Sequence, residues 1–286
     1  MIWQIYFVIL HQPKMRFLLI KMKKILLLLL VAIASGIGMQ ARELPAPTHK
    51  IEKMIGKVPN GYNFWLCTPP GGEEDPVGKP LVVFLHGRSL CGNNLDKVKK
   101  YGSLSYLLRG KNIDAYVIAP QNPGESWKPE KVWNTIDYVL DECNVDTTRI
   151  YVLGMSLGGY GTLDVAAAYP DRIAAAVAMC GGATMKDLSG LADMPLWIIH
   201  GTGDASVSVS QSDKVVEAIR KTQRENHLDN RLTYDRVPGM NHSRPARLFC
   251  NMGIYDWLFQ HSLDDEGRPS AKTKSLTDEF WGKCYN

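Results

Sequence analysis

The serine at position 156 has the sequence context of a nucleophile. It lies between two glycines in the stretch Gly154-Met-Ser156-Leu-Gly158, where an apolar, β-branched run gives way to a helical pattern. A serine hydroxyl attacks a carbonyl carbon only if it is exposed and held against a base, and a tight strand-to-helix turn presents it in this way. Flanking glycines remove the Cβ atoms that would clash in such a turn. The stretch therefore predicts a nucleophile elbow with Ser156 as the nucleophile.

A serine nucleophile needs a histidine as general base, and His242 is the best placed of the seven histidines. It lies in the loop between the last strand-like run and the last helical pattern, where the base belongs if the catalytic order is Ser, Asp, His. His86 and His200 each end a strand-like run before a glycine, so we expect them to brace loops by hydrogen bonding. The remaining four lie in the leader, before the fold, in a polar stretch and beyond the last helix: His11, His49, His227 and His261.

Asp204 is the expected acid, because it follows the strand-like run Leu196 to His200 by a few residues. Asp193 precedes that run and Asp213 opens a helical pattern, so both are in the wrong place. We expect Asp204 to accept a hydrogen bond from one ring nitrogen of His242, which leaves the other free to take the serine proton. The alternative is an aspartate that only forms a turn.

Attack on an ester or amide creates an oxyanion, which needs preorganised N–H donors. The backbone N–H groups of Leu157, directly after the nucleophile, and of Arg88, in the loop after His86, are the expected donors. The Arg88 side chain could steer an anionic substrate group or be solvated. Trp127 lies in another loop at this edge and is either a stacking wall of the substrate pocket or a core residue.

The rest of the chain predicts an α/β fold with a mostly parallel central sheet covered by helices on both faces. Reacting groups then gather beyond the carboxyl ends of the strands. The connection from 180 to 195 is too short for a lid domain, so we expect an open site. Strand-like runs lie at 61–68, 81–86, 113–119, 150–154, 174–179, 196–200 and 232–237, and helical patterns near 94–108, 129–142, 157–169, 211–225 and 245–260.

The pattern of residues 1–41 predicts an N-terminal leader. Met22-Lys-Lys is followed by an apolar segment and then by small residues up to Ala41, which is typical of a secretory signal, with translation starting at Met22 or Met15. A membrane anchor is the alternative, although the apolar segment is shorter than a membrane span. The predicted catalytic domain covers 42–261 and a polar tail covers 262–286. We therefore expect a periplasmic or extracellular protein without a stable membrane span.

Charge and cysteine content exclude several function classes. The leader holds five of the 33 basic residues and no acid, which leaves 28 basic against 29 acidic residues in the mature chain and gives no case for nucleic-acid binding. The six cysteines show no metal-ligand spacing, so we expect no metal and no cofactor. Cys67 and Cys180 are expected to be buried hydrophobes, and Cys250 with Cys284 is the candidate disulfide.

Taken together, these motifs resemble the α/β-hydrolase superfamily from about Gly61 to Leu258, and most of all its compact bacterial esterases of the phospholipase/carboxylesterase, dienelactone-hydrolase and prolyl-oligopeptidase-like branch. The shared features are His86-Gly87 after a strand, the elbow around Ser156, the acid at Asp204 and a late His242. Many relatives have Val-Pro after the acid, whereas this chain has Val207-Ser208. The serine nucleophile argues against haloalkane dehalogenases, which carry aspartate there.

This resemblance implies an exported serine hydrolase that cleaves carboxylic esters through an acyl-enzyme. The expected substrates are short-chain or aromatic acyl esters, either small molecules or decorations of a polysaccharide. A prolyl-oligopeptidase-like serine peptidase is the alternative enzyme, and an inactive fold used for binding is the alternative from another class. The sequence does not define the oligomeric state.

Overall fold

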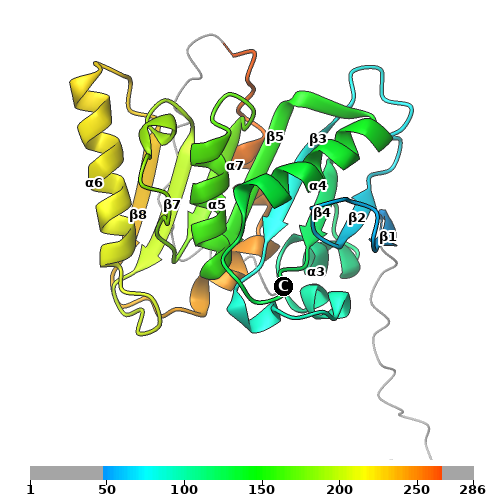
Figure 1. The fold of residues 1–286 in the computed structure, drawn as a ribbon, viewed down its shortest axis with the longest axis horizontal. Helices are drawn as coiled ribbons and strands as arrows, with labels where there is room; N and C mark the ends of the chain where they lie inside the picture. Colours follow the sequence, from blue (N-terminus) through cyan, green and yellow to red (C-terminus); the bar gives the residue numbers. More distant parts are fainter. Residues whose placement is uncertain (1–47, 266–286) are drawn as a thin grey trace, which may run out of the picture. The chain divides into compact units, whose positions relative to one another are not determined.

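The computed structural model describes residues 48–265, which form an eight-stranded sheet in the order β1-β2-β4-β3-β5-β6-β7-β8 (Figure 1). β2 pairs antiparallel with both of its neighbours, β1 and β4. The neighbouring strands β4, β3, β5, β6, β7 and β8 pair in parallel. The strands are β1 (Lys50–Met54), β2 (Phe64–Thr68), β3 (Lys79–Leu85), β4 (Tyr116–Pro120), β5 (Val145–Met155), β6 (Ala175–Met179), β7 (Leu196–Gly201) and β8 (Leu232–Val237).

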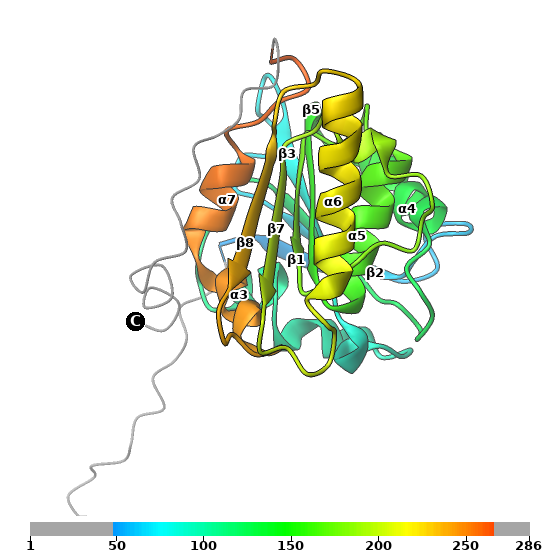
Figure 2. The same cartoon turned by 90° about the vertical axis from the view of Figure 1, so that its left-hand side faces the viewer.

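Helices cover both faces of the sheet, as the sequence predicts. Figure 2 shows α4, α5 and α6 on one side of the sheet and α3 and α7 on the other. The helices are α3 (Ser103–Leu108), α4 (Pro129–Glu142), α5 (Leu157–Ala168), α6 (Ser210–Glu225) and α7 (Met252–Leu258), with short 3₁₀ segments η1 (Arg88–Leu90), η2 (Leu95–Lys100), η3 (Ser189–Leu191) and η4 (Arg244–Cys250).

The apolar core lies in two layers, one on each face of the sheet. Alternate residues of β3 supply both layers: Val82 and Phe84 belong to one, and Leu81, Val83 and Leu85 to the other. All five side chains are fully buried. Burial on both faces explains why this strand reads as a continuous apolar run.

The structure corrects three expectations about element boundaries. β1 precedes the first predicted strand at 61–68, so His49 belongs to the fold. This histidine is 5% exposed, and its Nε2 lies 3.0 Å from the carbonyl oxygen of Ile113. The helix expected at 94–108 is η2 followed by α3, because Gly102 between them has a φ of 93°. The helix expected at 245–260 is likewise η4 followed by α7.

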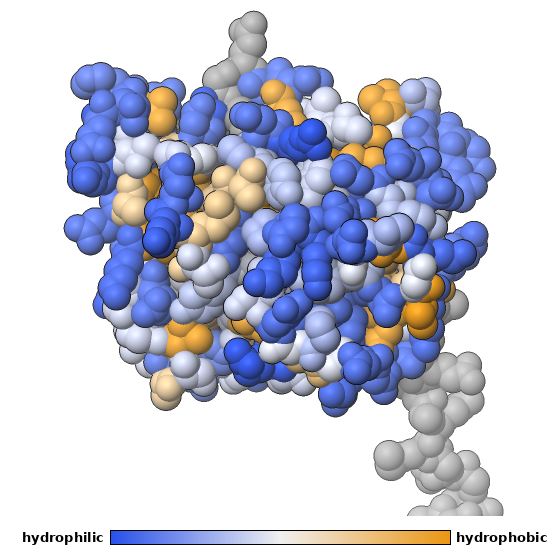
Figure 3. Space-filling model, in the orientation of Figure 1, coloured by the Kyte–Doolittle hydropathy of each residue, from blue (hydrophilic) through white to orange (hydrophobic). Residues whose placement is uncertain are grey.

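The connection between β6 and β7 contains only η3, so no lid domain is inserted there, as the sequence predicts. No helix within residues 48–265 is long and apolar enough to cross a membrane. Figure 3 shows a mostly hydrophilic surface on the face seen in Figure 1, with apolar side chains in small separate groups.

Several sequence predictions concern residues outside the described range. The leader up to Ala41 and its cleavage lie there, and so does most of the tail from 262 to 286. Cys284 is also outside, so its pairing with Cys250 stays a prediction. Cys67 and Cys180 are fully buried, which confirms the prediction that they are core residues.

Candidate active site

Ser156 lies in a strained turn between β5 and α5. Its backbone has φ 60° and ψ −123°, in the region of positive φ that costs a non-glycine residue roughly 1–3 kcal/mol. Two backbone hydrogen bonds hold this conformation. The Ser156 N–H donates to the carbonyl of Met179 over 2.8 Å, and its own carbonyl accepts from the N–H of Tyr160 over 3.0 Å. This is the geometry of the predicted nucleophile elbow.

The glycines around Ser156 permit close backbone packing against β3. A Cβ on Gly154 would lie 2.6 Å from the carbonyl oxygen of Leu85, and a Cβ on Gly158 would overlap the same oxygen. Real Cβ atoms essentially never approach a backbone oxygen so closely, so any side chain would push α5 away from β3. The glycines therefore fix the start of α5 against the strand that leads into Arg88.

Ser156, His242 and Asp204 form one hydrogen-bonded chain. His242 Nε2 lies 2.9 Å from the Ser156 Oγ, and His242 Nδ1 lies 2.6 Å from Asp204 Oδ2. The three residues are brought together from the elbow, from the loop after β7 and from the loop after β8. Because the carboxylate accepts at Nδ1, the neutral imidazole has its free lone pair at Nε2, facing the serine.

Asp204 is held as a buried carboxylate. Its side chain has no exposed surface. Desolvation raises the pKa of Asp204, but hydrogen bonds from the Val207 N–H, from His242 and from the Ser206 N–H outweigh it, so the net pKa is lowered. The two N–H groups both donate to Oδ1, each over 2.8 Å, which leaves Oδ2 for His242. The loop thereby fixes both the charge and the orientation of the acid.

His200 is a second histidine on the same carboxylate. Its Nε2 lies 3.0 Å from the Val207 carbonyl oxygen and 3.3 Å from Asp204 Oδ2, and its Nδ1 lies 2.7 Å from the Ser212 Oγ. Burial lowers the pKa of His200, so the ring is neutral at pH 7. Two oxygen acceptors at Nε2 favour a proton on that nitrogen, and the Ser212 hydroxyl that contacts Nδ1 donates to the Gly181 carbonyl over 2.7 Å. The expected loop brace is confirmed, but its contact with Asp204 was not foreseen from the sequence.

The two expected oxyanion donors face the same cavity as Ser156. Within residues 48–265, the N–H groups of Leu157 and Arg88 donate to no protein atom, and both residues line the cavity. His86 braces the loop that carries Arg88: its Nδ1–H donates to the Gly87 carbonyl over 2.8 Å. Its Nε2 accepts from the Asn122 N–H over 3.0 Å, which assigns the tautomer. Two unpaired donors beside a serine oxygen are suited to a developing oxyanion.

The cavity at Ser156 has a volume of about 570 Å³, a size typical of sites for small ligands. The exposed Arg88 side chain lines it, whereas Trp127 does not. Trp127 is 2% exposed, and its indole N–H donates to the His86 carbonyl over 3.2 Å. Trp127 is therefore buried like the core residue that the sequence left as an alternative. It also lines a smaller neighbouring cavity of about 180 Å³ together with Leu157 and Tyr160, so its role in substrate binding stays a prediction. Its hydrogen bond to His86 connects Trp127 to the loop that leads into Arg88.

One group of metal-binding residue types lies within the described range, and it includes the predicted acid and the predicted base. Ligand atoms of Cys180, Asp204 and His242 all lie within 4.8 Å of one another. Burial raises the pKa of the Cys180 thiol to about 12, so it stays protonated at pH 7 and is a poor ligand. His242 Nδ1 and Asp204 are already joined by their hydrogen bond. This group is better suited to proton transfer than to metal binding.

The sheet order and the position of the elbow define an α/β-hydrolase fold. Residues 126–254 match the phospholipase/carboxylesterase family model. A solved thermostable esterase superposes with a TM-score of 0.58 at 24% identity, covering 75% of this chain and 63% of that one. An acylaminoacyl peptidase from Pyrococcus horikoshii superposes with a TM-score of 0.57 at 13% identity, covering 85% and 45%.

Among curated proteins, acetylxylan esterase A from Emericella nidulans is 24% identical over 180 residues, which cover 57% of this chain and 57% of that protein. The chain thus spans little more than half the length of this relative. The chain therefore has an α/β-hydrolase fold and is similar to phospholipase/carboxylesterase proteins, which agrees with the resemblance found in the sequence.

Proposed function

We propose that this protein is an exported serine esterase that hydrolyses carboxylic esters through an acyl-enzyme. The observation that carries the proposal is the hydrogen-bonded chain from Ser156 through His242 to Asp204, next to two unpaired backbone N–H groups. The similarity to the phospholipase/carboxylesterase family and to an acetylxylan esterase supports the ester as the substrate class.

In the proposed reaction, Ser156 Oγ attacks the ester carbonyl carbon while His242 Nε2 takes the hydroxyl proton. The carbonyl oxygen becomes an oxyanion between the N–H groups of Leu157 and Arg88, and Asp204 stabilises the imidazolium. When the intermediate collapses, His242 gives its proton to the leaving alcohol and the acyl group stays on Ser156. A water molecule, deprotonated by His242, then releases the acid and restores the serine.

The open cavity supports short-chain or compact aromatic acyl groups. The short connection from Cys180 to Pro195 offers no apolar roof under which a long acyl chain could be buried. The alcohol part of the substrate would be a small molecule or a polysaccharide. Export rests on the leader up to Ala41, and N-terminal sequencing of the secreted protein should find a start between about Gly36 and Glu43.

The testing experiment is a substrate panel on the purified protein. It contains p-nitrophenyl esters of increasing acyl length, methyl ferulate, acetylated xylan and aminoacyl amides, assayed with the wild type and Ser156→Ala. We expect ester turnover by the wild type and its loss in the variant. Ser243→Ala is the matched control, because Ser243 lines the same cavity but is exposed and bonded to Asn241 rather than to a histidine. Turnover of the amides alone would replace the esterase by a peptidase.

A further inference from the structure

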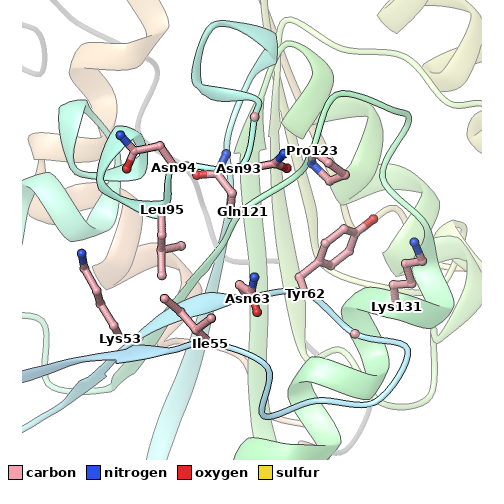
Figure 4. A pocket seen from close by; sticks show the side chains of 12 residues that line it. Lys53, Ile55, Tyr62, Asn63, Asn93, Asn94, Leu95, Gln121, Pro123 and Lys131 are labelled. Atoms are coloured by element: carbon pink, nitrogen blue, oxygen red, sulfur yellow. The ribbon is translucent and has the colours of Figure 1, made fainter.

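A second cavity lies beside the catalytic one and is lined by side-chain amides. It has a volume of about 550 Å³, and we call it the amide cavity after the four residues Asn63, Asn93, Asn94 and Gln121. Figure 4 shows Asn93 and Asn94 along one side, Asn63 with Ile55 on the opposite side, and Tyr62 with Lys131 at one end. The four amides come from the start of β2, the loop after β3 and the end of β4.

One loop connects the amide cavity to Ser156. The loop after β3 lines the catalytic cavity with Arg88 and Ser89, and it lines the amide cavity with Asn93 and Asn94. The side-chain amide of Gln121 stabilises the middle of this loop, because its Nε2 donates to the Leu90 carbonyl over 2.7 Å. A ligand long enough to cross this loop would reach both cavities.

The amide cavity holds hydrogen-bonding groups that the protein itself does not use. Gln121 is 6% exposed, yet its Oε1 has no partner within residues 48–265. This oxygen is itself buried, so a ligand hydroxyl would reach it, and remove the cost of its missing partner, only after the Gln121 side chain turns towards the cavity. The Nδ2 groups of Asn63 and Asn94 likewise make no hydrogen bond in this range, whereas their Oδ1 atoms accept from the N–H groups of Gly56 and Asp96. The site therefore offers both donors and an acceptor.

The charges at the amide cavity favour a neutral ligand. Two lysines line it, but each is already paired with an acid: Lys53 Nζ lies 2.8 Å from Asp96, and Lys131 Nζ lies 3.2 Å from Glu125. These pairs neutralise the positive charge that would attract a phosphate or a carboxylate. Amide donors and acceptors without net charge suit sugar hydroxyls, each of which both donates and accepts.

We propose that the amide cavity binds the neutral sugar chain that carries the ester, and so makes the protein an esterase of decorated polysaccharides. The proposal rests on the proposed esterase function for the identity of the scissile bond. In this arrangement a sugar unit next to the ester lies in the amide cavity, the chain crosses the loop near Leu90, and the acyl group enters the cavity at Ser156. Binding of unsubstituted sugar chains follows independently of hydrolysis.

The first test measures binding without chemistry. Xylohexaose and cellohexaose are titrated into the full-length protein by calorimetry, with the wild type, Asn94→Asp and Asn63→Asp. Both substitutions keep the oxygen that accepts the local N–H group and remove the unused Nδ2 donor. Asn226→Asp, directly after α6, is the matched charge control, since the Asn226 side chain donates to the Thr222 carbonyl and lines neither cavity. We expect one hexasaccharide to bind and each cavity variant to lose about fivefold or more in affinity, the control less than twofold.

The second test separates this cavity from the catalytic one. Asn94→Asp should raise KM for acetylated xylan by about fivefold and leave kcat/KM for p-nitrophenyl acetate within about twofold of the wild type. If neither hexasaccharide binds to the wild type at millimolar concentration, the proposal is overturned, and equal binding by the wild type and the cavity variants overturns it as well. Binding of a tetra-alanine peptide in place of the sugars overturns it in favour of a peptide site. Sugar binding without any ester turnover would support the amide cavity as a sugar-binding site and would refute the proposed esterase function.

Discussion

Asp204→Asn is the substitution whose effect follows most directly from the geometry. In the wild type the Oδ1 atom accepts two loop N–H groups, and Oδ2 accepts from His242 Nδ1 over 2.6 Å. An asparagine side chain keeps one oxygen for the loop, so its NH₂ group must face His242. That group donates to Nδ1 and moves the ring proton to Nε2, where it can no longer accept the proton of Ser156.

The expected loss in kcat/KM is about 10³- to 10⁴-fold, or about 4 to 5.5 kcal/mol of transition-state stabilisation at 1.36 kcal/mol per tenfold. The assay is p-nitrophenyl acetate hydrolysis at pH 8, with thermal unfolding to confirm a folded variant. Asp235→Asn is the matched control, because Asp235 is a partly buried carboxylate that accepts from the Trp197 indole and lies outside the site. A folded Asp204→Asn variant with more than about a tenth of wild-type activity would refute the assigned role of the acid.

Three further predictions concern packing, pH and substrate size. Gly158→Ala should destabilise the protein by about 1–3 kcal/mol, because its Cβ would overlap the Leu85 carbonyl, and an unchanged urea midpoint would contradict this packing. Burial lowers the pKa of His86 and of His261 to about 4, below the unfolded value of 6.5, so the unfolded state binds more protons between these values. The free energy of unfolding should therefore fall as the pH drops from about 6.5 to 4, and a flat urea midpoint over this range would count against neutral buried histidines. Without a lid, kcat/KM should not rise beyond butyryl esters although each buried methylene is worth roughly 0.8 kcal/mol, and a preference for C12 esters would show an apolar tunnel.

The sequence predicted most of the sheet and the residues that meet at its edge. Strands such as β3 are buried on both faces, so they appear as continuous apolar runs. Ser156, Asp204 and His242 follow three strands of the parallel part of the sheet, β5, β7 and β8, and the topology of such a sheet brings these loops together at one edge. Local glycine patterns also indicated the elbow, because only glycine permits the approach of α5 to Leu85.

The features that the sequence did not predict depend on distant contacts. β1 is an edge strand of mostly charged and half-exposed residues, so it carries no apolar signal. The contact between His200 and Asp204 depends on how the loop folds back, although their spacing of four residues is a signal in hindsight. The amide cavity combines residues from three separate segments, which no local pattern relates to one another. Trp127 could be assigned to the core only from its burial.

Labelling with a fluorophosphonate probe, followed by peptide mass spectrometry, tests the central claim most directly. The probe reacts covalently with a serine that a histidine activates, and the catalytic cavity contains four serines: Ser89, Ser156, Ser206 and Ser243. We predict one label per molecule, on Ser156 alone, with loss of esterase activity in proportion to labelling and no labelling of His242→Ala. Labelling of another serine, or full activity after complete reaction of Ser156, would contradict its role as the nucleophile.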